Sequence, residues 1–488
     1  MKKLIAGILV VFLFLAGVLV GRAELAFSDR QVQPTAGLGS VPVNREQAVK
    51  RFAQSLTYRT ISHDDRSRFD AEAFRSFHAF LRHSFPWVHR VAERTVVNGY
   101  SLVYRIPGSD PSLQPVLLMG HMDVVPVEDI TLSEWTHPPF AGVVGDGMVW
   151  GRGAVDDKLT VMALMEALEL SLSEGLQPAR SVYLAFGHDE EVGGADGAAN
   201  VAEYFREKNI TFDYVMDEGG AITTGMMEGM ERPVAVIGVS EKGYVNLVLK
   251  VNAPGGHSSQ PPDQTALGIL SRAIVRIEDN PFPASLEHMR ETFDFIGAEM
   301  PFMTRLAIAN LWLFAPLVEH TMLANKDDAA GIRTTTAATM ASGSPKANIL
   351  PTRATAVVNF RILPGETVDS VKQRVVRLID DERVTVSAEY GVNPSPVSPT
   401  DSKGFELIAS TIRGMDESIV VAPYMVRGGT DAKYFYGLSD NVYRFMMLRI
   451  DPETVKFIHG IDERIAVDAY VEAVEFNYHL LKRSMLGG

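Results

Sequence analysis

Acidic and histidine residues recur in this chain at the points where short apolar segments end. In chain order the series is His121 and Asp123, Asp156 and Asp157, Glu190 and Glu191, Asp217 and Glu218, and finally His459. Several of these groups follow runs that are typical of buried strands, such as Val116–Met119 and Leu184–Gly187. Carboxylates at the ends of buried strands require a compensating cation. The series therefore predicts a metal site with enough ligands for two ions, on a fold that brings these distant segments together.

Length, charge and cysteine content limit the class of protein. The chain has 488 residues, which exceeds what one hydrophobic core usually supports, so we expect two folded units. The net charge of −14 argues against a nucleic-acid partner, and an anionic substrate would have to be attracted locally by metals or arginines. Because the chain has no cysteine, disulfides, thiolate nucleophiles and Cys-ligated zinc are excluded. Metal ligands must then be His, Asp and Glu.

The N-terminal residues 1–27 contain an uninterrupted apolar run, Leu4–Val20, which follows Lys2 and Lys3. As a helix this run would span about 25 Å, near the lower limit for crossing a bilayer. The run is longer than a typical signal-peptide core, so we interpret it as an uncleaved signal anchor; the alternatives are a cleaved signal peptide and a buried core helix. The lysines would stay cytoplasmic, which places the remaining chain outside the membrane, either anchored or secreted. We interpret residues 28–44, which are polar and contain Pro and Gly, as a linker.

The apolar pattern predicts two domains. Strand-like runs alternate with helix-like segments such as Leu159–Glu174 over residues 45–243, which indicates an α/β unit with a largely parallel sheet. Ligands in such sheets bind at the carboxyl ends of the strands. We expect residues 244–388 to form a smaller α+β unit inserted into the first, and residues 389–488 to complete the first unit and deliver His459.

A long helical segment rich in Met, Phe and Leu lies within the predicted insertion. We interpret the apolar residues of Met300–Leu323 as packing residues. The alternative is an exposed apolar face that meets a membrane or an acyl chain.

Each acidic group has a commonplace alternative interpretation. His121 and Asp123 are two residues apart and would share one face of an extended segment, as a ligand and its orienting carboxylate do, but so would a surface pair. Asp156, at the start of a helix, could be an N-cap. Adjacent Glu190 and Glu191 point different ways, so one can bind metal while the other faces substrate. Single groups are weak evidence, and the five groups in order are strong evidence.

In their order and context these motifs resemble the aminoacylase, carboxypeptidase S and succinyl-diaminopimelate desuccinylase family of dinuclear zinc peptidases. The resemblance covers about Arg45 to Leu481. The long segment between about Asn280 and Met340 is most similar to the carboxypeptidase S branch, which includes secreted hydrolases of N-fatty-acyl amino acids. The resemblance implies an α/β, phosphorylase/hydrolase-like catalytic domain with an inserted α+β lid or dimerisation domain. It also implies two Zn²⁺ ions per chain, although Co²⁺ or Mn²⁺ would suit the same N and O ligands.

The resemblance further implies a role for each motif residue. His121 and Glu218 would hold one zinc, Glu191 and His459 the other, and Asp156 would bridge them. Asp217, next to Glu218, stays an alternative ligand. Glu190 would be the general base, and Asp123 would orient His121. His257 would stabilise the tetrahedral intermediate, often from the partner subunit of a homodimer, and Arg361 would bind the substrate carboxylate. Asn348, Gly429 and Thr430 would line the substrate.

The function predicted in this way is hydrolysis of the amide bond of a C-terminal or N-acylated amino acid that has a free carboxylate. A carboxypeptidase for small peptides and an N-fatty-acyl-amino-acid hydrolase or synthase would use the same residues, so both substrate classes stay open. A catalytically inactive, membrane-anchored binding protein is a third alternative, which the intact base Glu190 disfavours. The chain contains neither glycine-rich nucleotide-binding motif, which disfavours a nucleotide-dependent enzyme.

Overall fold

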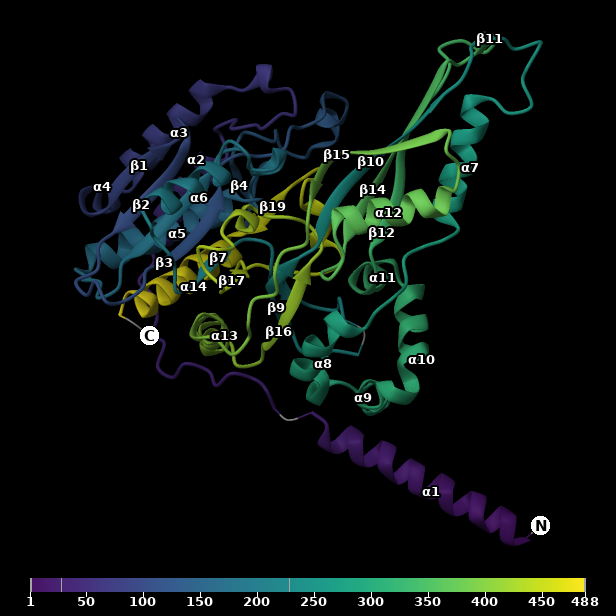
Figure 1. The fold of residues 1–488 in the computed structure, drawn as a ribbon. Helices are drawn as coiled ribbons and strands as arrows, with labels where there is room; N and C mark the ends of the chain where they lie inside the picture. Colours follow the sequence, from purple (N-terminus) through teal and green to yellow (C-terminus); the bar gives the residue numbers. More distant parts are fainter. Residues whose placement is uncertain (1, 28, 228, 487–488) are drawn as a thin grey trace.

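The computed structural model describes residues 2–27, 29–227 and 229–486, and Figure 1 shows their arrangement. The larger domain is built on a ten-stranded mixed sheet. Its strand order is β1 (Glu93–Val97), β2 (Ser101–Ile106), β6 (Val182–Gly187), β3 (Val116–His121), β7 (Val215–Asp217), β17 (Val442–Arg444), β9 (Val234–Glu241), β8 (Ala221–Thr223) and β18 (Arg449–Ile450), with β16 (Val420–Val426) paired to β9.

The centre of this sheet is parallel. Strand β3 pairs in parallel with β6 on one side and β7 on the other, so their carboxyl ends meet at one edge of the sheet. Every residue of β3 and β6 is buried, because helices cover both faces. Leu118 packs into the core on one face, with helix α5 (Lys158–Ser173). Leu117 packs into the core on the other face, with α6 (Ala198–Glu207). The predicted parallel α/β layer is confirmed.

Helix α5 is buried along nearly its whole length and packs against the C-terminal helix α14 (Val467–Met485). Helices that are apolar all round are found in the interior of large domains. The other helices of this domain are α2 (Arg45–Ser55), α3 (Ala71–Ser84), α4 (Pro86–Val91) and α13 (Lys403–Met415).

The smaller domain is an antiparallel four-stranded sheet with its own core. Its strand order is β12 (Thr335–Ser342), β14 (Arg353–Ile362), β10 (Gly243–Asn252) and β15 (Val384–Val392), and it is packed by helices α7 (Ala266–Glu278) and α12 (Val368–Ile379). Alternate residues of β10, among them Val245 and Leu247, face this core. A short ladder of β11 (Gly256–His257) and β13 (Ile349–Leu350) forms the tip of the domain, far from the large sheet (Figure 1).

Four helices between α7 and β12 lie against the larger domain, although their position in the chain is within the predicted insertion. They are α8 (Arg290–Ile296), α9 (Phe302–Ala309), α10 (Leu311–Ala324) and α11 (Lys326–Ile332). Phe293 and Phe295 of α8 belong to the core of the larger domain, and α8 packs on β16. The interpretation of Met300–Leu323 as packing residues is correct for Met300 and Ile308. In α10 it holds for Leu311 and Met322, which are partly buried against the same core. It is wrong for the exposed side chains of Trp312, Leu313, Leu317 and Leu323.

The N-terminal helix α1 (Lys2–Leu25) projects from the body (Figure 1). Its large apolar side chains from Leu4 to Phe14 are 56–74% exposed, so the alternative of a buried core helix is wrong. Among the described residues, α1 is the one helix that is long and apolar enough to cross a membrane by itself. The chain that follows α1 lies along the body. Gln31, for example, is buried and binds the backbone of Phe295 and Val421.

Candidate metal centre

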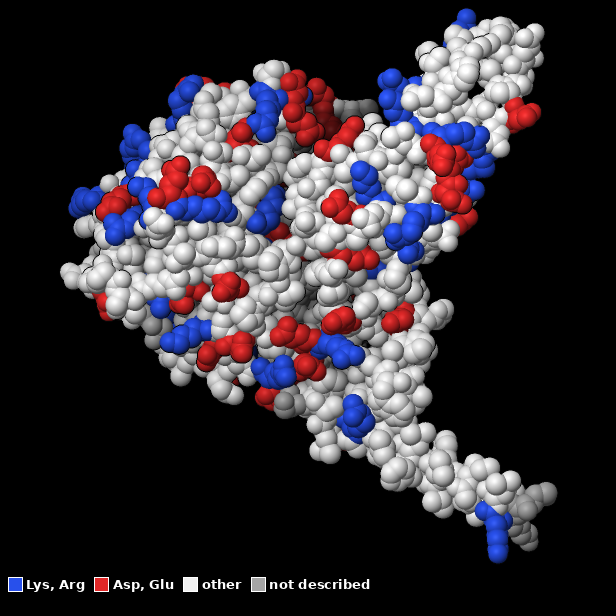
Figure 2. Space-filling model, in the orientation of Figure 1, with Lys and Arg blue, Asp and Glu red and all other residues white. Residues whose placement is uncertain are grey.

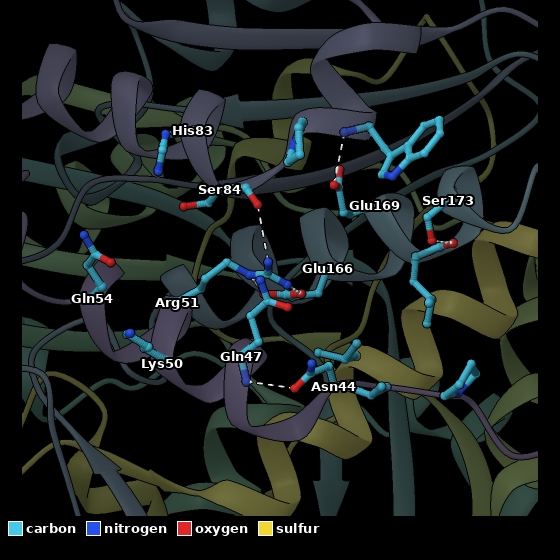
Figure 3. Close-up of a pocket in the computed structure, with 16 residues that line it drawn as sticks. Asn44, Gln47, Lys50, Arg51, Gln54, His83, Ser84, Glu166, Glu169 and Ser173 are labelled. Atoms are coloured by element: carbon cyan, nitrogen blue, oxygen red, sulfur yellow. Dashed lines mark hydrogen bonds and ion pairs between the residues drawn. The ribbon is translucent and has the colours of Figure 1, made fainter.

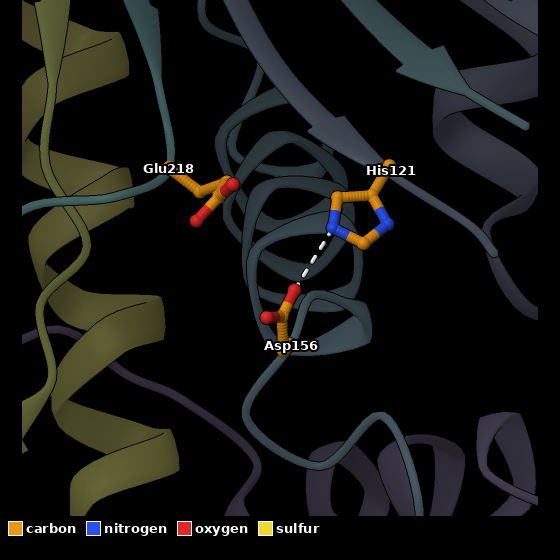
Figure 4. A group of neighbouring side chains, drawn as sticks. All are labelled: His121, Asp156 and Glu218. Atoms are coloured by element: carbon orange, nitrogen blue, oxygen red, sulfur yellow. Dashed lines mark hydrogen bonds and ion pairs between the residues drawn. The ribbon is translucent and has the colours of Figure 1, made fainter. Parts of the chain in front are cut away.

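The ends of the central parallel strands bring the predicted site residues together. His121 is the last residue of β3, and Glu218 directly follows β7. Asp156 lies two residues before α5, which begins at the same edge of the sheet. Figure 4 shows the side chains of these three residues pointing toward one another.

Two groups of three possible metal ligands share Asp156. His121, Asp156 and Glu218 form one group, and Asp156, Glu191 and His459 form the other; within each group the ligand atoms lie within 4.8 Å of one another. Asp156 Oδ1 lies 2.9 Å from His121 Nε2, and Asp156 Oδ2 lies 3.0 Å from His459 Nε2. Glu191 Oε2 lies 3.3 Å from His459 Nε2. One carboxylate thus faces both imidazoles.

The N-cap interpretation of Asp156 is wrong. Helix α5 begins at Lys158, so the capping position belongs to Asp157, whose side chain makes no capping hydrogen bond. Asp157 instead accepts a hydrogen bond from the backbone amide of His121 at 3.2 Å. The Asp156 carboxylate faces the histidines.

Asp123 is fully buried and connects the two glutamates to His121. Its two carboxylate oxygens accept hydrogen bonds from the backbone amides of Glu190 at 3.2 Å and Glu191 at 3.1 Å. His121 Nδ1 lies 3.0 Å from the Asp123 carbonyl oxygen and 3.4 Å from its Oδ1. Burial alone would raise the pKa of Asp123, but the contacts with His121 hold this pKa below its ordinary value. Asp123 therefore fixes both the imidazole and the turn that carries Glu190.

Glu190 lies beside the first group, with Oε2 4.0 Å from His121 Nε2. Burial raises the pKa of Glu190 well above its ordinary value. His121 opposes this shift, whereas the neighbouring carboxylates of Asp431 and Glu191 add to it. A carboxyl group with a raised pKa suits proton transfer near neutral pH.

The donor set fits divalent metal ions. Burial raises the pKa of Glu218 well above its ordinary value, and the negative charge of Asp156 raises it further. Glu191 Oε1 is buried and has no hydrogen-bond partner among the described residues, so this oxygen is free to bind a cation. Imidazole nitrogens and carboxylate oxygens are the ligands that Zn²⁺ takes in catalytic sites.

Asp217 and Glu218 have different surroundings. Asp217 Oδ2 accepts a hydrogen bond from the backbone amide of Ala432 at 2.7 Å, and Oδ1 accepts one from the amide of Glu218 at 3.0 Å. Asp217 belongs to neither ligand group, whereas Glu218 does.

Comparison with known proteins agrees with this geometry. The family model described as "Peptidase family M20/M25/M40" matches residues 117–483, which include every member of both ligand groups. The chain belongs to peptidase family M20/M25/M40. The predicted family is therefore confirmed, and the chain is a peptidase or amidohydrolase. M20 metallopeptidases use divalent metals, typically zinc.

Individual relatives cover most of the chain. "Probable carboxypeptidase S-like 2" of Dictyostelium discoideum is 40% identical over 443 residues, which cover 90% of this chain and 85% of the relative. "N-fatty-acyl-amino acid synthase/hydrolase PM20D1" of Homo sapiens is 39% identical over 419 residues, covering 84% of this chain and 83% of the relative. The solved M20 family metallo-carboxypeptidase Sso-CP2 from Sulfolobus solfataricus has a TM-score of 0.65 at 19% identity, covering 90% of this chain and 99% of that one. This structural likeness confirms the predicted α/β zinc-peptidase fold.

A buried ion pair in this M20 chain joins the two loops that carry Asp156 and His459. Glu463 is fully buried, and its Oε1 accepts hydrogen bonds from the amides of Val155 at 2.8 Å and Asp156 at 3.3 Å. Its Oε2 accepts a hydrogen bond from Arg152 at 2.7 Å, and Arg152 also donates to the His459 carbonyl at 3.1 Å. Sequence reasoning missed this pair, because nothing in the local spacing of Glu463 distinguishes it from a surface acid.

His257 and Asn348 lie together at the tip of the smaller domain. The backbone amide of Ser258 donates to the Asn348 carbonyl at 3.1 Å, and His257 Nδ1 lies 2.8 Å from Ser259 Oγ. His257 is exposed to solvent. The tip at β11 lies far from the candidate metal centre of the same chain (Figure 1).

Arg361, Gly429 and Thr430 lie nearer the larger domain. Arg361 pairs in register with Tyr244, at the start of β10, and its guanidinium carbon is 4.7 Å from the centre of the Tyr244 ring. Thr430 is buried, and its amide donates to Glu241 at 3.1 Å. The next residue, Asp431, packs against Gly187 at the end of β6, so the loop that carries Gly429 and Thr430 reaches the edge of the sheet where the metal ligands lie.

A separate cavity of about 550 Å³ lies among α2, α4 and α5 (Figure 3). Three of its charged side chains already have partners: Arg51 donates to Glu166 at 2.6 Å, and Glu169 accepts the amides of Trp87 and Val88. The residues described as lining this cavity include no member of either ligand group. The metal centre, rather than this cavity, is the candidate site of the M20 chemistry.

Proposed function

We propose that this protein is a dinuclear zinc hydrolase that cleaves the amide bond of a C-terminal or N-acylated amino acid with a free carboxylate. The observation that carries the proposal is the pair of ligand groups that share Asp156. In this assignment His121 and Glu218 bind one ion, Glu191 and His459 bind the other, and Asp156 bridges them. Glu218 is preferred over Asp217 because the Asp217 carboxylate is held by the backbone amides of Ala432 and Glu218.

Glu190 is the proposed general base. Zinc bound by these ligands would supply Lewis-acid activation of a water molecule and of the scissile carbonyl. Glu190 accepts the proton of the attacking water and passes it to the leaving amine. Asp123 keeps Glu190 in place through the backbone amide of that residue.

Residues of the smaller domain and of the loop after β16 complete the proposed site. Arg361 forms a bidentate pair with the free carboxylate of the substrate, which selects amino acids at that position. Asn348, Gly429 and Thr430 line the substrate. His257 stabilises the oxyanion of the tetrahedral intermediate. Because His257 lies at the far tip of its own chain, we propose that it acts on the metal centre of a partner subunit in a homodimer.

Two substrate classes fit these residues equally well. Relatives of similar identity are named as carboxypeptidase S-like proteins and as N-fatty-acyl-amino acid synthase/hydrolases. We propose a carboxypeptidase S-like activity, with hydrolysis of N-fatty-acyl amino acids as the second candidate. We also propose that α1 is a membrane anchor, because its apolar side chains are exposed along the helix.

The proposal is tested by assaying the zinc-loaded protein on a dipeptide and on a long-chain N-acyl amino acid. Each substrate is paired with a control in which the free carboxylate is converted to an amide. We expect hydrolysis of at least one free acid, loss of activity on chelation, recovery with zinc, and little activity on the amides. Hydrolysis that survives complete chelation would contradict the metal mechanism. Absence of hydrolysis in the zinc-loaded protein would favour a binding protein.

A further inference from the structure

Helix α10 is apolar, but most of its large side chains lie outside the core, against which only Leu311 and Met322 of the described α10 residues are partly buried. Its sequence is Leu-Trp-Leu-Phe-Ala-Pro-Leu-Val-Glu-His-Thr-Met-Leu-Ala, and none of these described residues is buried. Trp312 is 60% exposed and Leu317 is 58% exposed, and Met303 of the preceding helix α9 is 71% exposed. Figure 2 shows a largely uncharged surface over α10, with basic atoms beside α9. A contiguous apolar surface of this kind indicates an interaction site.

The position of this surface points to its partner. The joint between α9 and α10 is fastened to the last turns of α1: Arg22 Nε donates to the Ala309 carbonyl at 3.1 Å, and Asn310 Nδ2 donates to the Leu19 carbonyl at 3.0 Å. Arg305 of α9 forms an ion pair with Glu24 of α1 at 3.1 Å. The apolar surface is therefore continuous with the end of the helix that enters the bilayer in the proposed anchoring (Figure 1).

The dimensions of α9 and α10 suit a bilayer surface and do not fit a second straight membrane span. Helix α10 has 14 residues, about 21 Å, whereas the hydrocarbon core of a bilayer is about 30 Å thick. Helices α9 and α10 are bent by 118° relative to each other, so together they do not form one straight span. Tryptophan is enriched at the interface between lipid and water, and Glu319 and His320 keep part of α10 polar. Exposed apolar side chains next to a tryptophan are features of a segment that lies at the interface between lipid and water.

We propose that α9 and α10 insert into the interfacial layer of the membrane beside the base of α1. The protein is then held at two points, and the body cannot rotate freely about the anchor. The inference rests on the proposed anchoring by α1.

The absence of native cysteine allows a direct test on the full chain. Single variants Leu317→Cys and Met303→Cys carry a spin label, and the protein is reconstituted into phosphatidylcholine nanodiscs. Ile130→Cys, at an 82% exposed site, is the aqueous control, and Leu9→Cys in α1 is the membrane control. Accessibility to oxygen, which partitions into lipid, is compared with accessibility to a water-soluble nickel complex. A circular-dichroism spectrum and an unfolding midpoint equal to those of the wild-type protein confirm that each variant is folded.

We expect the labels at Leu317 and Met303 to collide several-fold less often with the nickel complex than the label at Ile130, and more often with oxygen. Nickel accessibility equal to that at Ile130, with the Leu9 label protected, would overturn the inference and leave the anchor intact. If the Leu9 label were also accessible to nickel, the anchor and the inference would both be wrong. Dipolar broadening between Leu317 labels would show that a second copy of the chain covers this face, which would also overturn the inference. None of these results depends on the zinc mechanism.

Discussion

Glu190 and Glu191 are neighbours in the chain, but their side chains have different surroundings. Glu191 Oε2 contacts His459, and its other oxygen is buried without a partner among the described residues. Glu190 lies beside His121, outside both ligand groups. At the level of single residues, this separation supports the proposed roles of Glu191 as a metal ligand and Glu190 as the general base.

The Glu190→Gln variant should separate metal binding from catalysis. The substitution keeps the shape of the side chain but removes the base, so turnover should fall by at least ~10²-fold. The metal content should stay at the wild-type value, because Glu190 is not a ligand in this assignment. Metal analysis and steady-state kinetics on the same sample make the measurement. The matched control is Glu191→Gln, which should lose metal; metal loss from Glu190→Gln instead would mean that the two roles are reversed.

Removal of Glu463 should destabilise the protein strongly. The Glu463→Ala variant leaves the buried Arg152 guanidinium without its carboxylate, and breaking a buried pair in this way costs about 3–5 kcal/mol. Metal affinity should fall as well, because Glu463 holds the amide of Asp156. Chemical unfolding and metal titration test this prediction, with Glu453→Ala in the exposed Glu453–Lys456 pair as the control, at a cost of at most ~1 kcal/mol. Equal stability of the two variants would show that Glu463 has no structural role.

The predictable part of the site consists of residues next to recognisable elements. His121 and Glu218 lie at the ends of apolar strands, and the sequence predicts that the carboxyl ends of parallel strands meet at one edge of the sheet. Glu463 and Arg152 lie more than 300 residues apart in the chain, so only the folded contact reveals their role. The preference for Glu218 over Asp217 as the proposed ligand likewise depends on a folded contact, because the amide of Ala432 donates a hydrogen bond to the Asp217 carboxylate.

At the level of elements, the segment after α1 is a packed part of the body, although its composition suggests a linker. The Gln31 amide nitrogen donates to the carbonyls of Phe295 and Val421, and the Gln31 carbonyl oxygen accepts the amide of Val421 at 2.7 Å. Arg413 also donates to the Val32 carbonyl at 2.5 Å. A polar composition cannot predict such packing, because a single buried amide satisfies backbone groups of two other elements.

The Gln31→Ala variant should therefore lower the stability of the full chain by about 1–3 kcal/mol, since it leaves buried backbone groups unsatisfied. Gln33→Ala is the matched control, because Gln33 is exposed. Unfolding of both detergent-solubilised variants by denaturant gives the measurement. A Gln31→Ala midpoint equal to that of Gln33→Ala would mean that the segment contributes nothing to the fold.

The elements differ in how well the sequence predicts them. Strands β3 and β6 are continuous apolar runs between polar segments, and they form buried strands as expected. Helix α10 has an equally apolar sequence and is not buried. An apolar sequence shows that a segment avoids water. It does not show whether a protein core or a lipid surface surrounds that segment.

At the level of the whole molecule, the two domains leave the proposed site divided. The metal ligands lie at the edge of the large sheet, whereas His257 lies at the far tip of the smaller domain (Figure 1). A symmetric dimer that places each tip over the partner's metal centre would complete two sites.

Mixing of two inactive variants tests this arrangement. His257→Ala and Glu190→Gln chains should each be nearly inactive, but a mixed dimer has one site with an intact base and an intact partner histidine. After full subunit exchange the mixture should reach about one quarter of wild-type activity, because about half of the dimers are mixed and each has one complete site. Exchange is followed independently with fluorescent labels. Demonstrated exchange without recovered activity would place His257 in the same chain as the metal centre that it serves.

The central claim is that two metal ions share Asp156. Anomalous diffraction at the zinc edge from crystals of the zinc-loaded protein tests it most directly. We expect two anomalous peaks per chain on either side of the Asp156 carboxylate, one next to His121 and Glu218 and the other next to Glu191 and His459. A single peak, or peaks that do not contact Asp156, would contradict it.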